Sequence, residues 1–261
     1  MTDEPLQRGL TLRAMVPNAI TAAALCAGLT GIRFAITGDF EKSVQAIVLA
    51  GLLDGIDGRV ARLLKAQSRF GAELDSLADN VSFGVAPALV LFLWSLKEEL
   101  PRIGWLAALA FAIACALRLA RFNAQIDLPD EPRKTAGFLT GVPAPLGAGL
   151  VFLPMYLSFE TNNEQFRNPV LVSVWLVAIG FLLISNIATF SWGKLRPRQH
   201  VRLEVIALFG LIAGGLLTVP WWTLSAICAV YLASMPLAAV LYARVKRRRA
   251  MAALGEPDAP A

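Results

Sequence analysis

Four aspartates that can do chemistry lie in a part of the chain that is otherwise mostly apolar: Asp54, Asp57, Asp75 and Asp79. One carboxylate in a bilayer-centred helix costs about 2.5–3.5 kcal/mol on insertion scales. Four carboxylates that each faced lipid alone would therefore cost on the order of 10 kcal/mol. Such a group should persist only where positive charge compensates it, and bound metal cations supply that charge most directly.

The spacing of these aspartates predicts that their carboxylates converge. Asp54 and Asp57 are three residues apart, and Asp75 and Asp79 are four apart, so each pair lies on one face of a helix. Because a short joint connects the two helices, we expect them to be antiparallel neighbours. Carboxylate oxygens suit hard divalent cations, and four of them balance two such ions: Mg²⁺ or Mn²⁺, with Ca²⁺ as a further candidate occupant. Two such cations can clamp a phosphoryl group during its transfer.

Two glycines and an arginine extend this pattern. Gly58 lies four residues after Asp54, and Gly71 lies four residues before Asp75. Because these positions have no side chain, a bulky ligand can approach the backbone there. Arg62 follows Gly58 by one more helical turn and can bind a phosphate with two parallel hydrogen bonds.

Ordinary ion pairs are the alternative explanation for the acidic cluster. In that case the aspartates would pair with nearby basic residues between neighbouring helices: Arg59, Arg62 and Arg69. The acids outnumber the nearby bases within membrane depth, and glycines lie one turn from the first and third aspartates. We therefore favour the metal site.

The composition indicates an integral membrane protein. Of the 261 residues, 56% are hydrophobic and 16% are charged, whereas soluble domains carry about 25% charged residues. The basic residues behind the net charge of +5 fall between apolar stretches, which favours membrane topology and lipid headgroups over nucleic acid. The single histidine, His200, excludes mechanisms that need two.

Apolar stretches of about 20 residues recur along the chain, as bilayer-crossing helices require. We expect an all-α fold, a polytopic membrane helix bundle with about eight transmembrane helices. The expected spans are 17–37, 43–64, 72–96, 102–123, 142–159, 168–190, 202–219 and 221–243. Basic residues gather at the amino terminus and at every second joint, so both termini and the aspartates should face the cytoplasm. We expect one catalytic bundle over 1–249 and a disordered tail over 250–261.

The aspartate pattern resembles the signature of the CDP-alcohol phosphatidyltransferases, membrane enzymes that move a phosphatidyl group from a cytidine diphosphate lipid to an alcohol. It reads Asp54-Gly-Ile-Asp57-Gly58-Arg-Val-Ala61-Arg62, eight residues, Gly71, three residues, Asp75, three residues, Asp79. The resemblance implies that the first three aspartates bind metal and that the fourth is both a metal ligand and the general base. It also implies that Gly58, Ala61 and Gly71 border the cytidine diphosphate and that Arg62 contacts its phosphates. The family-like core would cover about 16–190, the helices at 202–243 would be additional, and a homodimer is expected.

Flanking motifs resemble the branch of this family that uses L-serine as the acceptor. They are Pro17-Asn18-Ala-Ile-Thr21, Asn80-Val-Ser82-Phe83-Gly84, Arg118-Leu-Ala-Arg121-Phe122-Asn123 and Phe138-Leu-Thr-Gly141-Val-Pro143. This resemblance implies that CDP-diacylglycerol and L-serine give phosphatidylserine and CMP at the inner cell membrane. Asn18 and Thr21 would then contact the CDP-lipid from the first span. Arg118 or Arg121 would hold the serine carboxylate, with Ser82 and Asn123 as polar partners.

Two alternatives remain open. Within the family, the acceptor would be glycerol phosphate, inositol phosphate or choline. A phosphorylated acceptor needs more cationic pocket residues and choline needs an aromatic cage, whereas serine needs one anion site and one ammonium site. Outside the family, a cation transporter would line its path with carboxylates and be built from matched halves. The aspartates instead gather at one end of the bundle, which favours the enzyme.

Overall fold

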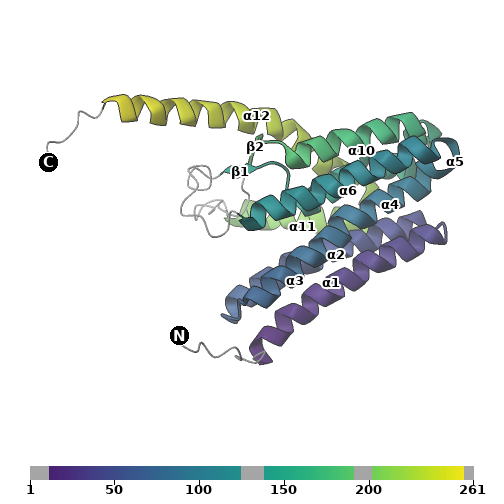
Figure 1. Ribbon diagram of the computed structural model, residues 1–261, viewed down its shortest axis with the longest axis horizontal. Coiled ribbons are helices and arrows are strands. Elements are labelled where there is room, and N and C mark those ends of the chain that lie inside the picture. Colours follow the sequence, from purple (N-terminus) through teal and green to yellow (C-terminus); the bar gives the residue numbers. More distant parts are fainter. Residues whose placement is uncertain (1–11, 125–137, 191–201, 256–261) are drawn as a thin grey trace, which may run out of the picture.

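The protein is almost entirely helical over the residues that its computed structural model describes, which are 12–124, 138–190 and 202–255. Figure 1 shows long helices lying side by side, with the last helix extending beyond the bundle at its C-terminal end. The prediction of a helical bundle is thus confirmed for nearly all of the described residues. A small exception is a pair of three-residue strands, β1 (Phe138–Thr140) and β2 (Ala188–Phe190), which are antiparallel with Phe138 opposite Phe190.

The first two helices form a closely packed hairpin of α1 (Leu12–Ile36) and α2 (Phe40–Leu63). Gly38 takes a positive φ of 82° in the turn, a conformation that favours glycine. A Cβ at Gly31 would lie 3.0 Å from the carbonyl oxygen of Ser43, so the two backbones approach too closely for a larger residue. Asp39 caps α2 and pairs with Lys42, whose hydrogen bond lowers the pKa of the Asp39 carboxyl.

The helices that follow α2 form one continuous helical rod that contains two wider π-helical turns. Its parts are α3 (Arg69–Asp79), η1 (Asn80–Val85), α4 (Ala86–Leu91), η2 (Phe92–Leu96) and α5 (Lys97–Glu99). The first π turn begins directly after Asp79. Pro87 follows it, and proline lacks an N–H and crowds the carbonyl group four residues earlier. A π turn therefore interrupts the regular helix between the aspartates and the buried middle of the rod.

The remaining described elements complete the bundle. They are α6 (Pro101–Ala124), α8 (Ala144–Val151), α9 (Leu153–Thr161), η3 (Glu164–Arg167), α10 (Pro169–Ile184), α11 (Arg202–Thr218) and α12 (Pro220–Gly255). The predicted span 168–190 is wrong at its end, because α10 stops at Ile184 and Ser185 is extended before β2. The tail predicted to begin at residue 250 is also wrong in part, since α12 continues to Gly255. Residues 256–261 lie outside the described part.

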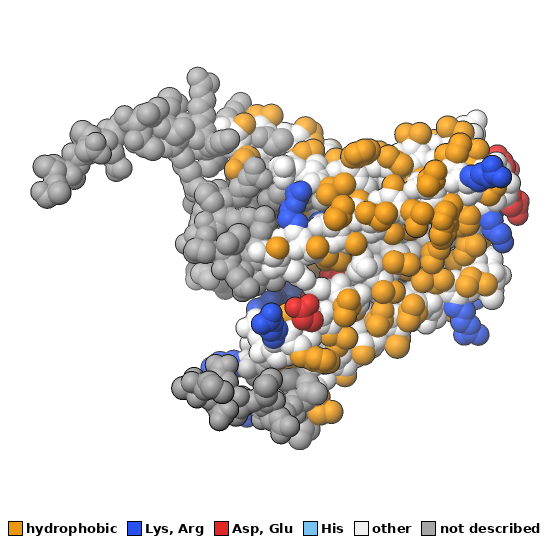
Figure 2. All heavy atoms as spheres, in the orientation of Figure 1, with side chains coloured by type: hydrophobic (Ala, Val, Ile, Leu, Met, Phe, Trp, Pro, Cys, Tyr) orange, Lys and Arg blue, Asp and Glu red, His pale blue; other side chains and the backbone are white. Residues whose placement is uncertain are grey.

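Within the described residues, four helical stretches are long and apolar enough to cross a bilayer: Met15–Ile36, Arg69–Glu99, Pro101–Ala124 and Pro220–Ala243. Pro169–Ile184 and Leu203–Thr218 are shorter apolar helices. The predicted count of about eight is therefore not confirmed. In Figure 2 apolar side chains cover the flank of the bundle, and charged side chains lie toward its two ends. This distribution fits a protein whose flank contacts lipid and whose ends contact water.

The C-terminal helix α12 packs against the bundle rather than standing apart from it. The Trp221 ring stacks on Tyr156 of α9, with centroids 6.2 Å apart and planes 17° apart. The Trp221 ring also contacts Phe159 at a centroid distance of 5.0 Å. Cys228 donates a weak hydrogen bond to the Gly149 carbonyl oxygen at 3.5 Å. Side chains of α12 therefore belong to the same apolar core as α8 and α9.

Candidate active site

The structure brings the four aspartates together at one end of the bundle. Asp54 and Asp57 lie in the second half of α2, and Asp75 and Asp79 lie in α3. One carboxylate oxygen from each of Asp54, Asp57 and Asp75 lies within 4.8 Å of the other two. The carboxyl group of Asp79 lies beside that of Asp54 and interacts electrostatically with those of Asp75 and Asp57. Asp57 is buried at 4% exposure, and the other three are half-buried.

The helix α1 orients one of these carboxylates through Thr21. The buried Thr21 hydroxyl lies 2.6 Å from Asp57 Oδ2 and also lies 3.1 Å from the Pro17 carbonyl oxygen. Thr21 is predicted to contact the CDP-lipid, but its hydroxyl is directed at the aspartate. A hydrogen bond of this kind fixes the rotamer of a metal-ligating carboxylate.

Replacing Thr21 by valine should raise the divalent cation concentration for half-maximal activity about 10-fold, because Asp57 loses the donor that orients it. The shape of the side chain is nearly conserved, so the maximal rate at saturating cation should change less. Thr30→Val is the matched control, since the Thr30 hydroxyl of the same helix donates to the Cys26 carbonyl oxygen one turn earlier. Equal cation requirements in the two variants would contradict the role given to Thr21.

No ion pair joins the aspartates to a basic side chain of the described residues. Among the described residues, the ion pair that forms joins Lys42 Nζ to Asp39 Oδ2 at 2.6 Å, at the opposite end of α2. The alternative of interhelical aspartate–arginine pairs is therefore not seen. A cluster of carboxylates that forms no ion pair within the described residues, in helices whose outer faces are apolar, has the donor set that hard divalent cations prefer.

The space beside the cluster is open at Gly58. A Cβ placed there would meet one atom within 4 Å, Arg62 Nη1 at 3.7 Å. The Arg62 guanidinium thus lies at the edge of this space, where a phosphate can reach it, and half-buried Ala61 borders the same stretch of α2. This arrangement agrees with the predicted positions of a nucleotide lipid, whose contacts themselves stay predictions.

The backbone at Gly71 is approached by Asn18 of α1. A Cβ at Gly71 would lie 3.0 Å from Asn18 Oδ1 and 3.1 Å from Ser68 Oγ, the residue that caps α3. Asn18 Nδ2 is buried and has no hydrogen-bond partner among the described residues. The two predicted CDP-lipid contacts therefore lie together, and the Asn18 amide has a donor available for a ligand.

The four residues predicted to bind serine are used differently. Arg118 is half-buried, and its guanidinium interacts electrostatically with Asp79. Arg121 instead donates to the Ile184 carbonyl oxygen at 3.2 Å and to Asn186 Oδ1 at 3.0 Å. The structure therefore directs Arg118, and not Arg121, toward the aspartates.

The other two predicted serine contacts take part in packing between helices. Asn123 Nδ2 donates to Ser76 Oγ of α3 at 2.8 Å. Ser82 is 1% exposed, and its Oγ would lie 2.5 Å from a Cβ placed at Gly28 of α1. These contacts fix α1 and α6 against the rod that carries Asp75 and Asp79.

Two polar residues that neighbour residues of the site were not predicted from the sequence as site residues. Asn80 follows Asp79 directly, and its buried Oδ1 has no hydrogen-bond partner among the described residues. Its adjacency to the signature was the signal that could have drawn attention to it. Tyr231 of α12 interacts electrostatically with Arg118, and nothing in the local sequence indicates that contact.

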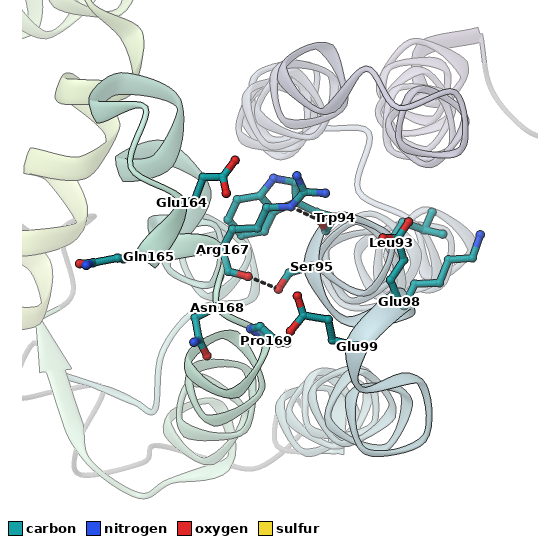
Figure 3. Close-up of a pocket in the computed structure, with 11 residues that line it drawn as sticks. Leu93, Trp94, Ser95, Glu98, Glu99, Glu164, Gln165, Arg167, Asn168 and Pro169 are labelled. Atoms are coloured by element: carbon teal, nitrogen blue, oxygen red, sulfur yellow. Dashed lines mark hydrogen bonds between the residues drawn. The ribbon is translucent and has the colours of Figure 1, made fainter.

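The bundle also has a hollow of about 480 Å³ at the end opposite the aspartates (Figure 3). Its charged lining residues are Lys97, Glu98, Glu99, Glu164 and Arg167. The backbone and side chain of Arg167 are engaged there, since Ser95 Oγ donates to its carbonyl oxygen at 2.6 Å and its Nε donates to the Trp94 carbonyl oxygen at 2.8 Å. Within the described part of the chain, three side chains lie close enough together to share a metal in the aspartate cluster, at Asp54, Asp57 and Asp75. We therefore place the active site there and not in the hollow.

Comparison with known proteins identifies the family of the chain. The sequence model described as CDP-alcohol phosphatidyltransferase matches residues 14–188, and the one described as CDP-alcohol phosphatidyltransferase 2 matches residues 200–236. A relative from Mycobacterium leprae is named CDP-diacylglycerol–serine O-phosphatidyltransferase and is 36% identical over 238 residues, which cover 91% of this chain and 79% of the relative.

Relatives of the same name occur in distant organisms. The protein from Helicobacter pylori is 33% identical over 198 residues, covering 76% of this chain and 81% of its own. The protein from Methanocaldococcus jannaschii is 37% identical over 192 residues, covering 73% of this chain and 80% of its own. The resemblance drawn from the aspartate signature is therefore confirmed, and the protein is an enzyme of the CDP-alcohol phosphatidyltransferase family.

Proposed function

We propose that this enzyme transfers the phosphatidyl group of CDP-diacylglycerol to the hydroxyl group of L-serine, giving phosphatidylserine and CMP. The observation that carries the proposal is the convergence of four carboxylates at one end of a membrane bundle, with no ion pair to a basic side chain among the described residues. Serine as the acceptor is supported by the names of the relatives and by Arg118, a cation beside Asp79 that suits a carboxylate.

The donor set supports a pair of divalent cations, Mg²⁺ or Mn²⁺. Asp54, Asp57 and Asp75 would hold them, with Asp79 completing the site. When bound, the cations would neutralise charge on the diphosphate of the donor lipid. Because the carboxylates and the cations compensate each other, the loaded site would also remove the cost of carboxylates at membrane depth.

The reaction is a direct displacement at the phosphorus that carries the diacylglycerol. The serine hydroxyl oxygen forms a bond to that phosphorus while the bond to the CMP oxygen breaks. Asp79 accepts the hydroxyl proton, since a neutral serine hydroxyl is too weakly acidic to react unaided. Arg62 would bind a phosphate of the donor, and Gly58 leaves room for it beside α2. CMP departs with the electron pair of the broken bond.

We propose that the carboxylate end of the bundle faces the cytoplasm of a cell with the enzyme in its inner membrane. Described basic residues gather at that end: Arg62 near the end of α2, Lys65 just after it, Arg69 at the start of α3, and Arg118 and Arg121 in α6. The opposite joints mix bases with acids, as in Asp39 with Lys42 and Lys97 with Glu98. This asymmetry follows the positive-inside rule. The packing of α12 on α8 and α9 supports a single catalytic bundle over 1–249. The homodimer stays a prediction.

The acceptor is tested by measuring CMP release from CDP-diacylglycerol with the purified enzyme. We expect release with L-serine and Mn²⁺ or Mg²⁺, a labelled phosphatidylserine product from labelled serine, and loss of both after EDTA treatment. Glycerol phosphate, inositol phosphate and choline should release little CMP. Release with glycerol phosphate but not with serine would overturn the acceptor, and undiminished release in EDTA would overturn the metal site. Cation flux into liposomes without lipid turnover would instead favour a transporter.

A further inference from the structure

Two polar side chains from separate helices interact electrostatically with each other, one of them also interacts with Asp79, and each has an unsatisfied hydrogen-bonding atom. Arg118 lies on α6, and its Nε is buried without a hydrogen-bond partner among the described residues. Tyr231 lies on α12 and is 4% exposed, and its hydroxyl group also has no partner within the part of the chain that is described. Buried donors are nearly always paired in folded proteins, so two unpaired donors that interact electrostatically indicate a ligand that accepts from both.

The surroundings of these two groups define the charge of that ligand. The Arg118 guanidinium interacts electrostatically with the Tyr231 hydroxyl and with Asp79. Thr189 lies near the Tyr231 hydroxyl, but no hydrogen bond of good geometry joins them, and Thr189 Oγ1 donates to the Gly141 carbonyl oxygen at 2.8 Å. The site therefore offers a cationic N–H and a neutral O–H, and a carboxylate is the small group that accepts from both.

We propose that Tyr231 of α12, together with Arg118 of α6, binds the carboxylate of the acceptor amino acid. This inference rests on the proposed function, in which that acceptor is L-serine. An amino acid held by these two side chains lies on the side of the cluster where Arg118 approaches Asp79, so its hydroxyl group can reach the general base. An alcohol without a carboxylate would leave both donors unpaired, and sites built around a polar group discriminate strongly against ligands that lack it.

The hydroxyl group of Tyr231 is the part that packing alone does not require. The ring belongs to the apolar core, in contact with the same group of buried side chains as Cys228 and Tyr156. Phenylalanine would fill that space equally well. A tyrosine that serves only as packing would therefore tolerate the loss of its hydroxyl group.

Tyr231→Phe should raise the KM for L-serine about 10-fold, because a hydrogen bond to a charged group is lost. It should leave the KM for CDP-diacylglycerol unchanged and kcat within about 2-fold. The dissociation constant of L-serine, measured by titration calorimetry with CDP and Mn²⁺ present, should rise by the same factor. Neither KM nor the dissociation constant depends on the fraction of protein that is folded, so a merely structural role would not change them.

Tyr156→Phe is the matched control. Tyr156 is buried, and its hydroxyl group also has no hydrogen-bond partner among the described residues, but its ring stacks on Trp221 instead of facing Arg118. We expect its KM for serine to equal that of the wild type. If the wild-type enzyme uses serine and Tyr231→Phe has an unchanged serine KM and dissociation constant, this inference is wrong and the proposed function stands. If the wild-type enzyme forms no phosphatidylserine, the proposed function itself fails.

Discussion

Replacing Asp79 by asparagine should lower kcat about 10³-fold, because the amide cannot accept the proton of the attacking hydroxyl group. Asparagine keeps nearly the same shape and removes one of four mutually repelling carboxylates, so the fold should persist. Turnover is measured as CMP release at saturating CDP-diacylglycerol, serine and divalent cation. The KM for the donor lipid should change much less than kcat, since the loss falls on the chemical step.

Glu73→Gln is the control for this experiment. Glu73 lies on α3 two residues before Asp75, but its side chain is exposed. The substitution makes the same change of charge on the same helix without touching the cluster, and we expect the wild-type rate. An Asp79→Asn enzyme that retains more than about a tenth of the wild-type kcat would rule out Asp79 as the general base.

Replacing Gly58 by leucine should lower kcat/KM for CDP-diacylglycerol by at least about 100-fold, the loss expected when a substrate is displaced by an ångström or more. The structure makes this a test of the site rather than of the fold. A Cβ at Gly58 meets no atom closer than Arg62 Nη1 at 3.7 Å, so the new side chain enters the space assigned to the nucleotide lipid. Glycine is a poor helix former, and leucine should leave the melting temperature unchanged or raise it.

Gly55→Leu provides the matched comparison in the same helix. Gly55 is exposed, and a Cβ there has no atom within 4 Å. Both substitutions improve the helix propensity of α2, but only the one at residue 58 borders the proposed lipid contact at Arg62. We expect Gly55→Leu to keep near-wild-type kinetics. Equal activity of the two variants would mean that the donor lipid does not approach α2 at Gly58.

The aspartate cluster could be predicted from the sequence because it depends on local geometry. Spacings of three and four residues fix which side chains share a helical face, and a short joint makes the two helices neighbours. The same reasoning placed Gly58 and Arg62 beside Asp54. It favoured metals over arginines as the compensation for the aspartates, but it could not show where the long arginine side chains point after folding.

Other features depended on contacts between distant parts of the chain. Arg118 and Arg121 are three residues apart, yet one faces Asp79 and the other bonds to the end of α10. The strand at Ala188–Phe190 needs a partner 50 residues earlier, so its apolar residues read as the end of a helix. The contribution of Tyr231 likewise depends on how α12 returns to the bundle. Hydrophobic periodicity contains no information on such pairings.

The position of the carboxylates at the end of their helices has a consequence for how the enzyme meets its two substrates. A water-soluble amino acid arrives in three dimensions, whereas the nucleotide lipid arrives by lateral diffusion within a leaflet. The effective concentration of the nucleotide lipid is therefore its mole fraction among the surrounding lipids. Added inert lipid lowers this mole fraction even when the total amount of nucleotide lipid in the sample stays the same. The proposed acceptor, serine, has no such dilution, so membrane composition and the supply of dissolved amino acid act on the rate through separate concentrations.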